Sequence, residues 1–243
     1  MSSSVLLYNL FPVHHWKLLT KKLLEYCRHD DIYIHVSLPI LKAVPWKKYR
    51  IKKYLSRFTD EKKVFFSINR KKKGESTGFL SFRKKIDFAR YSIATYIHSK
   101  GVSKRKWRSK NVYDWTLLMK YFVIDRLDLC ETAFANGYKL YGCLLRTKEQ
   151  LESGNDSAFF NSNFHYSGNF VSVNLSELRQ KFVSAPITPG FFGVESFWGT
   201  LCDSHSAFNV HESGIKNHYE SPYPELLYKD CEFLLKKRPC RNG

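Results

Sequence analysis

Residues 4–38, SVLLYNLFPVHHWKLLTKKLLEYCRHDDIYIHVSL, decide the fold. Residues 4–10 form a short apolar run that stops near a proline, which is typical of a buried strand. In residues 15–24 the apolar side chains recur on one helical face and lysines lie opposite. Residues 32–38 resume as a strand that ends before Pro39. A strand, a helix and a strand this close together predict a right-handed crossover between parallel strands.

The rest of the chain continues this alternation. We expect one long helix or two abutting helices over residues 112–135, with Asp114 capping the start and Gly137 ending it. Residues 146–163 are polar and form the long loop of the second half. Further strands are predicted at 63–69, 92–98, 138–145 and 164–173, and short helices at 176–182 and 194–201. Since no repeat or low-complexity linker interrupts the chain, we predict a single α/β domain over residues 1–243. Its central sheet is mostly parallel and flanked by helices.

Composition excludes several classes of protein. The 243 residues are 43% hydrophobic, too apolar for a disordered chain, and carry a formal net charge of +18. No apolar run is long enough to span a membrane, and the first residues lack the basic and small-residue pattern of a secretory signal. The sequence therefore predicts a cytoplasmic protein. The six cysteines show no CxxC spacing, so we interpret them as reduced thiols and not as a zinc site or a disulfide framework.

The positive charge is concentrated in residues 47–110. This segment holds 22 basic and 4 acidic residues, a net of +18, while the remainder holds 18 of each sign. Nucleic acid, an anionic membrane surface and a phosphorylated ligand are all suitable partners for such a block. A solvated, solubilising surface is the plain alternative for any single cluster. The concentration favours a functional role for part of the block without choosing the partner.

Most common enzyme and nucleic-acid motifs are absent. The chain has no GxGxxG after the first strand and no GxxxxGK[ST], so the usual phosphate-binding loops are missing. GxSxG, HExxH and paired Cys/His fingers are missing as well.

Three local groups of residues carry chemistry. Residues 96–103, YIHSKGVS, follow a predicted strand and precede Trp107-Arg108, and their His, Ser, Lys and Arg side chains can donate to a diphosphate. The plain alternative is a strand end that runs into a basic turn. Residues 165–170, HYSGNF, offer hydrogen bonds to hydroxylated ligands, although Ser-Gly-Asn is also ordinary turn chemistry. Residues 195–198, ESFW, place a carboxylate capable of deprotonating a hydroxyl beside aromatics that stack on sugars. A first-turn Glu with core aromatics is the alternative there.

In this order and spacing, these segments resemble bacterial glycosyltransferases of capsule and O-antigen gene clusters. The shared pattern is Y-x-H-[S/T]-K-G, a downstream W-R, H-x-S-G-N-F, E-x-W and a tyrosine-rich tail that begins with H-Y, and it covers nearly the whole chain. One departure is Val171-Ser172, where the family usually has aromatic residues. In this sequence the pattern is carried by residues 96–101, Trp107-Arg108, residues 165–170, residues 195–198 and His218-Tyr219 through Tyr228.

The resemblance implies a GT-A-like, Rossmann-like nucleotide-sugar fold, with a donor-binding half over about residues 1–145 and an acceptor and catalytic half over about 146–243. It implies transfer from a nucleotide-diphosphate sugar, with a UDP-sugar preferred, to a growing glycan on a lipid carrier. Such an enzyme would lie peripherally on the inner face of the cytoplasmic membrane. Glu195 would act as the base or the acceptor anchor. The donor phosphates would be bound by His98, Ser99, Lys100, Gly101 and Arg108. The sugar or acceptor would be bound by His165, Ser167, Gly168, Asn169 and Trp198.

The metal requirement stays open at this point. Many GT-A enzymes hold Mn²⁺ or Mg²⁺ with a D-x-D motif, and no D-x-D occurs here. Asp125 and Asp128 fall inside the predicted helix and are interpreted as surface acids. Basic side chains can also neutralise a leaving diphosphate without metal. The alternative function is a basic nucleic-acid-binding protein that uses residues 47–110, although no specific nucleic acid is expected as partner.

Overall fold

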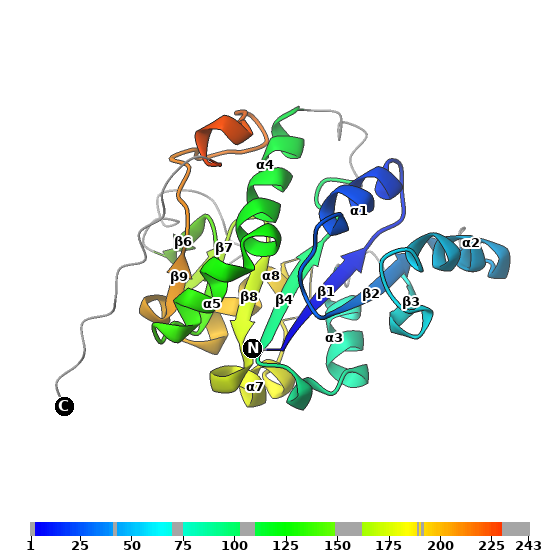
Figure 1. The fold of residues 1–243 in the computed structure, drawn as a ribbon, viewed down its shortest axis with the longest axis horizontal. Coiled ribbons are helices and arrows are strands. Elements are labelled where there is room, and N and C mark those ends of the chain that lie inside the picture. Colours follow the sequence, from blue (N-terminus) through cyan, green and yellow to red (C-terminus); the bar gives the residue numbers. More distant parts are fainter. Residues whose placement is uncertain are drawn as a thin grey trace.

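The computed structural model describes residues 3–40, 43–69, 75–102, 110–148, 162–188, 190 and 192–229. Within them, seven strands form one central sheet in the order β3-β2-β1-β4-β8-β5-β9, and two more form a separate ribbon (Figure 1). The sheet strands are β1 (Ser4–Leu10), β2 (Asp31–Leu38), β3 (Val64–Ile68), β4 (Ile93–His98), β5 (Leu140–Gly142), β8 (Val171–Asn174) and β9 (Ala207–Asn209). The ribbon pairs β6 (Leu145–Thr147) with β7 (Phe164–Tyr166).

The sheet is mostly parallel. β1 pairs in parallel with both β2 and β4, and β2 pairs in parallel with β3. β8 is antiparallel to both of its neighbours, β4 and β5, while β9 is parallel to β5. The direction therefore reverses only at β8 within the described sheet. This arrangement confirms the predicted single α/β domain and is consistent with a Rossmann-like fold.

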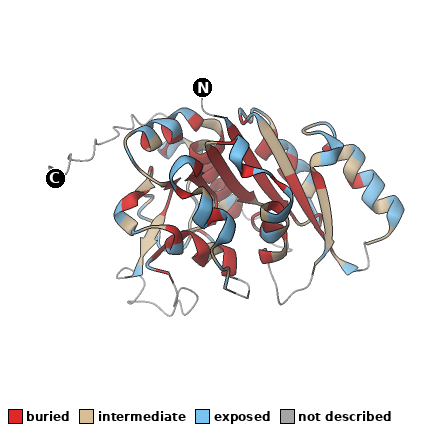
Figure 2. Cartoon of the chain, turned by 90° about the horizontal axis from the view of Figure 1, so that it is seen from below, coloured by how far each residue is buried: buried red, intermediate tan, exposed pale blue. Residues whose placement is uncertain are grey.

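Helices cover both faces of the sheet (Figures 1 and 2). One buried cluster packs α1, α2, α4 and α5 on one face, and a second packs α3, α7 and α8 on the other. The α-helices are α1 (Trp16–Leu24), α2 (Pro45–Leu55), α3 (Ser76–Lys85), α4 (Lys110–Lys120), α5 (Leu127–Ala135), α7 (Leu175–Ser184) and α8 (Gly193–Leu201). A π-helical turn covers Tyr121–Asp125, and 3-10 turns cover Glu61–Lys63, Phe88–Arg90, Ser204–Ser206 and Glu225–Leu227.

Strand β1 lies at the centre and is buried along its whole length. Because strand side chains alternate, Leu6 and Tyr8 point to the α1/α4 layer while Val5 and Leu7 point to the α3/α8 layer. By the same alternation Asn9 faces the α3/α8 layer. It is a polar side chain at the buried end of an otherwise apolar strand.

The strand order reverses at β1. The chain moves from β1 outward to β2 and β3 and then returns to the other side of β1 as β4. The two strand ends are joined, since the Ser99 amide donates to the Asn9 carbonyl at 3.1 Å and the Phe11 amide donates to the Ser99 hydroxyl at 2.9 Å. In open α/β sheets, ligands bind beyond the carboxyl ends of the strands at such a switch point.

The long helical stretch is confirmed as two abutting helices, α4 and α5, separated by the π-helical turn. Gly137 follows α5 with a φ of +84°, as expected of a residue that ends a helix. The capping role predicted for Asp114 is wrong, because α4 already runs from Lys110 and Asp114 lies inside it. Asp125 and Asp128 pair with Lys120 and Arg126 along the helices, as predicted for surface acids.

Two predicted strands are broken in the structure. Residues 138–145 form β5 and part of β6, which belong to different sheets, because Leu144 adopts a φ of +60° and turns the chain. Residues 164–173 form β7 and part of β8, because Gly168 and Asn169 adopt φ values of +93° and +62°. Most of the predicted loop, residues 149–161, lies outside the described residues.

Among the described residues, Cys27, Cys130 and Cys143 are free thiols, in line with the sequence. Cys231 and Cys240 lie outside those residues. Over the same part of the chain, no helix combines the length and the apolar character that crossing a bilayer requires.

Candidate functional site

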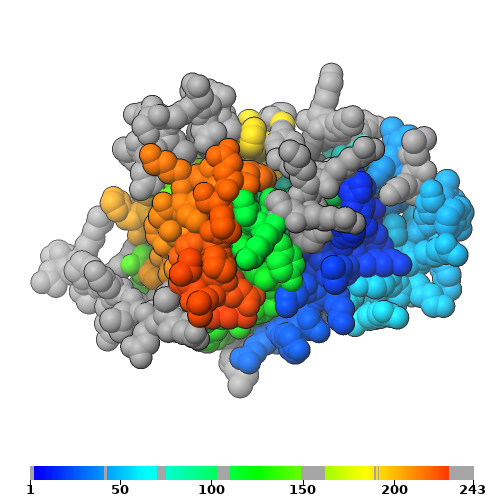
Figure 3. Space-filling model, turned by 90° about the horizontal axis from the view of Figure 1, so that it is seen from above, coloured from blue at the N-terminus to red at the C-terminus, as the bar shows by residue number. Residues whose placement is uncertain are grey.

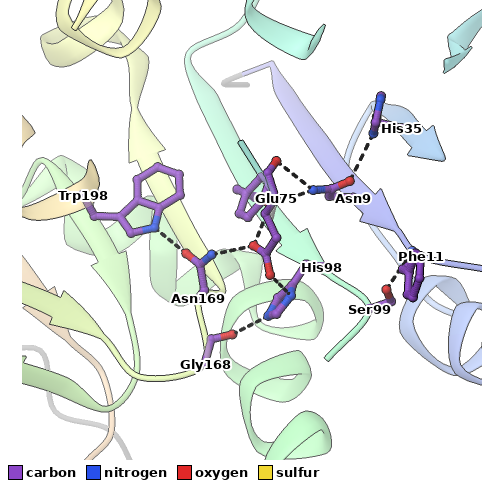
Figure 4. Close-up of polar contacts among 10 residues, drawn as sticks. Asn9, Phe11, His35, Glu75, His98, Ser99, Gly168, Asn169 and Trp198 are labelled. Carbon is purple, nitrogen blue, oxygen red and sulfur yellow. Dashed lines mark hydrogen bonds and ion pairs between the residues drawn. The ribbon is translucent and has the colours of Figure 1, made fainter. Parts of the chain in front are cut away.

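A half-buried carboxylate, that of Glu75, lies at the centre of a polar network beside the switch point (Figure 4). Glu75 immediately precedes α3, and its Oε1 forms an ion pair with Nδ1 of His98 at the end of β4. Its Oε2 accepts hydrogen bonds from the Tyr96 hydroxyl at 3.0 Å and from the Asn169 amide at 2.9 Å. Both carboxylate oxygens are therefore occupied by side chains from other elements, which fixes the position of Glu75.

Asn9 ties the start of α3 to the central strand. Its amide nitrogen is 3.1 Å from the Glu75 carbonyl and 3.2 Å from the Tyr96 hydroxyl, and its amide oxygen is 3.1 Å from Nδ1 of His35. Gly78 permits this approach, because a Cβ at that position would lie 2.4 Å from the Asn9 amide oxygen. A helix that begins this close to the strand holds Glu75 at the carboxyl edge of the sheet.

Asn169 connects the network to α8. Its amide oxygen accepts the indole N–H of Trp198 at 2.5 Å while its amide nitrogen donates to Glu75. The left-handed conformations of Gly168 and Asn169 turn the chain into this position. Gly168 has no room for a side chain, since a Cβ there would lie 2.3 Å from Sδ of Met119. The residue type at 168 is therefore set by both space and backbone conformation.

Both ring nitrogens of His98 face hydrogen-bond acceptors. Nδ1 faces the Glu75 carboxylate, and Nε2 lies 3.0 Å from the Gly168 carbonyl oxygen. The Glu75 carboxylate and the Gly168 carbonyl therefore occupy both ring nitrogens of His98. No ring nitrogen is left for a direct phosphate contact.

Glu195 supplies a second carboxylate in the first turn of α8. Burial raises its pKa, Lys100 and His98 oppose this effect, and the charge of Glu75 adds to it, so the net pKa lies above the ordinary value. Its Oε1 lies 3.8 Å from Nδ1 of His165. Burial lowers the pKa of His165 to about 3, so its imidazole is neutral near pH 7.

The two carboxyl groups differ in pKa. Burial would raise the pKa of Glu75 too, but the charge of His98 and hydrogen bonds from His98 and Tyr96 outweigh burial and lower it. Two interacting acids whose environments separate their pKa values are typical of acid–base sites. Glu75 is suited to stay charged and to position His98. Glu195, with the raised pKa and few partners, is the stronger base.

Lys100 places a buried ammonium group in the same region. Its Nζ lies 4.0 Å from the centre of the Trp115 ring and 5.5 Å from that of Tyr219, and the residue is only 8% exposed. The Trp115 ring is also stacked on the His218 ring, with the two ring centres 5.3 Å apart. Among the described residues no carboxylate lies within ion-pair distance of Lys100. The charges of Glu195 and Glu75 act on it from a longer range, since Lys100 lowers the pKa of both carboxyl groups. A buried cation that forms no direct ion pair can attract an anionic ligand.

The structure brings most of the predicted site residues to one edge of the sheet. His98 is the last residue of β4, and Ser99, Lys100 and Gly101 follow it. His165, Ser167, Gly168 and Asn169 lie in or after β7. Gly101 has a φ of +69° and packs against Val112. Ser167 is half-buried, and its amide donates to the Leu144 carbonyl at 2.9 Å. Arg108 and Trp107 lie outside the described residues.

Trp198 has a different environment from the one its predicted stacking role requires. Its ring is fully buried and packs edge-on against Phe79 at 5.5 Å and tilted against Tyr96 at 5.7 Å. Neither ring face is open to a sugar. Trp198 reaches the site only through its indole N–H, which orients Asn169.

Sequence reasoning missed Asn9, Glu75 and the role of the Tyr96 hydroxyl. Two signals pointed to them. Glu75 is the sole acidic residue between Glu61 and Asp87, a segment rich in lysine and arginine. Asn9 is an amide within an apolar strand, and buried polar groups of this kind are hydrogen-bonded.

Within the described residues, no group of three or more His, Cys, Asp or Glu side chains is arranged to hold a metal ion. Neither protein-family models nor curated proteins match this chain.

Proposed function

We propose that this protein is a glycosyltransferase that moves a sugar from a nucleotide-diphosphate donor, preferably a UDP-sugar, to a hydroxyl of a growing surface glycan. The glycan would be of capsule or O-antigen type and carried on a lipid. The observation that carries the proposal is the pair of carboxyl groups, Glu75 and Glu195, with opposite pKa shifts beside the buried Lys100 ammonium. A base and a buried cation at a switch point are the groups that transfer from a diphosphate donor needs.

In this proposal Lys100 binds the donor diphosphate. Trp115 and Tyr219 hold its ammonium in place. Glu75 and Gly168 fix the orientation of the neighbouring His98 ring. The Lys100 charge stabilises the diphosphate as the bond between the anomeric carbon and its oxygen breaks and the electron pair moves to the leaving group. Ser99 and Gly101 shape the turn that carries Lys100.

Glu195 takes the proton of the acceptor hydroxyl while that oxygen forms the new bond to the anomeric carbon. A carboxylate with a raised pKa accepts this proton more readily than an ordinary one. His165, next to Glu195, remains neutral and leaves the carboxylate without a fixed ion pair. Asn169 and Trp198 are positioning residues, because they fix Glu75 and the turn at Gly168.

Binding of the donor is the direct test. Calorimetry with UDP and a panel of UDP-sugars should give saturable binding that Lys100→Ala weakens. Lys84→Ala, an exposed lysine at the end of α3, is the matched control and should bind like the wild type. Absence of binding to every nucleoside diphosphate and nucleotide sugar tested would overturn the proposal.

A further inference from the structure

Two helices that take no part in the site form a continuous basic surface. The Tyr54 hydroxyl of α2 donates to the Lys17 carbonyl of α1 at 2.7 Å, and Tyr54 packs against Trp16 at 5.1 Å. Figure 3 shows the two helices side by side, α1 in blue and α2 in lighter blue. Neither helix contains an acidic residue. Together they carry Lys17, Lys21, Lys22, Lys47, Lys48, Arg50, Lys52 and Lys53.

Large apolar side chains are exposed within this basic field. Helices that follow parallel strands begin at the carboxyl edge of the sheet, and the exposed residues come from the first turns of α1 and α2, from just after β2, and from the end of β3. Side chains of this size and character are usually buried in a protein core, but these are exposed to solvent. They are Leu18 at 62%, Ile40 at 69%, Trp46 at 55% and Ile68 at 49% exposure.

We infer that this carboxyl-edge surface of α1, α2 and the ends of β2 and β3 docks on an anionic lipid bilayer. Clustered lysines and arginines bind acidic headgroups, and exposed tryptophan and aliphatic side chains enter the interface between headgroups and acyl chains. The inference rests on the lipid-carried acceptor of the proposed function, and it names the surface that would hold the protein at the membrane. It also turns the edge that carries Lys100 and Glu195 toward the lipid.

A nucleic acid fits this surface less well. Leu18, Ile40 and Ile68 offer nothing to a phosphate backbone. Single-stranded nucleic acids are bound by aromatic rings on which bases stack. The Trp46 ring is already contacted by two cations, Nζ of Lys47 and the guanidinium of Arg50, each 5.2 Å from its centre. The surface therefore combines positive charge with exposed apolar side chains, a combination that suits binding to the interface of a bilayer.

The contribution of the basic residues to membrane binding is tested by sedimentation with two kinds of vesicle. One is phosphatidylcholine alone, and the other is an equal mixture of phosphatidylcholine and phosphatidylglycerol. The full chain should bind only the mixed vesicles. A triple variant, Lys48→Gln, Arg50→Gln and Lys53→Gln, should bind on the order of 10²-fold more weakly, since each basic residue near the surface contributes about fivefold. The control triple removes the same charge at the opposite edge, with Lys84→Gln, Lys85→Gln and Arg90→Gln. This control should lose much less affinity for the mixed vesicles. An equal loss of affinity in both triple variants would overturn the inference.

The apolar contribution is tested by Leu18→Ser and Trp46→Ser against Val183→Ser, which alters an exposed position on α7. The first two should weaken vesicle binding several-fold and the third should not. No effect of the first two would overturn the docking surface, as would tighter binding to single-stranded DNA that the same basic triple abolishes. Calorimetry with UDP on these variants separates the two proposals. If wild-type protein binds vesicles but no nucleotide, the sugar-transfer proposal fails and the docking surface stands.

Discussion

Asn169 donates an amide hydrogen to the Glu75 carboxylate across 2.9 Å, joining residues that are 94 positions apart in the chain. The same side chain accepts the indole N–H of Trp198 through its oxygen. One amide thus sets the position of a charged group at the switch point and of the helix that carries Glu195. The stability of the site depends on this amide.

We expect Asn169→Ala and Trp198→Phe each to lower the free energy of unfolding by about 1–3 kcal/mol, because each leaves a buried polar partner unsatisfied. The double variant should cost less than the sum of the two, since both remove the same hydrogen bond. Urea denaturation of the four proteins gives the comparison. Strict additivity would show that the bond contributes nothing.

Gly168→Ala should be more destabilising than Gly214→Ala. Both glycines have a positive φ, so alanine costs about 1–2 kcal/mol at either position. At Gly214 a Cβ would meet nothing within 4 Å, whereas at Gly168 it would press on Met119, which adds roughly 1–3 kcal/mol of overpacking. Equal losses in thermal or urea unfolding would mean that Met119 moves aside at no cost.

The protein should lose stability as the pH falls from about 6.5 to about 4. Burial lowers the pKa values of His29 and His35 to about 4 and that of His165 to about 3. In this window the unfolded chain binds protons that the folded chain does not, so protonation favours unfolding. Urea midpoints at several pH values should show the decline. His29→Gln should reduce its slope, and an unchanged slope would place the effect elsewhere.

Lys100 and Glu195 should separate donor binding from turnover. Lys100→Ala should weaken nucleoside-diphosphate binding by about 1.5–3 kcal/mol, as expected for a hydrogen bond to a charged group. Glu195→Gln should leave donor affinity nearly intact and reduce turnover on the order of 10²–10⁴-fold. Calorimetry and a sugar-transfer assay on both variants check this division. The opposite pattern would reverse the two roles.

Donor binding should withstand a chelator better than in a D-x-D enzyme, because no D-x-D occurs in the chain and Lys100 already supplies positive charge. The measurement is calorimetry with UDP in EDTA. Complete loss of binding, restored by Mn²⁺, would point to carboxylate ligands of a metal that the sequence does not reveal.

The strand–helix–strand opening was predictable because its apolar spacing is strong and its ends are marked by proline and aspartate. Helices α2 and α3 were not assigned from the sequence for a physical reason. Only Ile51 and Leu55 of α2 are buried, so its apolar face is too sparse to stand out among lysines. In α3, Gly78 lowers helix propensity and is present for close contact with Asn9.

The sequence could predict which edge of the sheet carries the candidate site, but it could not predict which side chains pair with one another there. The His-Ser-Lys-Gly segment and the turn at Gly168 carry residue types that indicate ligands and turns. The partner of His98 is Glu75, 23 positions earlier and before a helix that sequence periodicity did not identify. Trp198 shows the reverse case, because its residue type suggested an open stacking surface while its position in α8 faces the core. Both the partner of His98 and the burial of Trp198 depend on contacts between residues far apart in the chain, and local sequence patterns do not predict such contacts.

The position of β8 bears on how the chain folds as it is synthesised. Strands β1 to β4 are made first and pair with one another, but β5 pairs only with β8 and β9, which are both made later. Until Val171–Asn174 leaves the ribosome, β5 has no neighbour and Asn169 is not in place to meet Glu75. The first half of the chain can therefore assemble a sheet during translation, while the completed site waits for the last third. A nascent chain released early would carry Lys100 without Glu195, and so an incomplete candidate site.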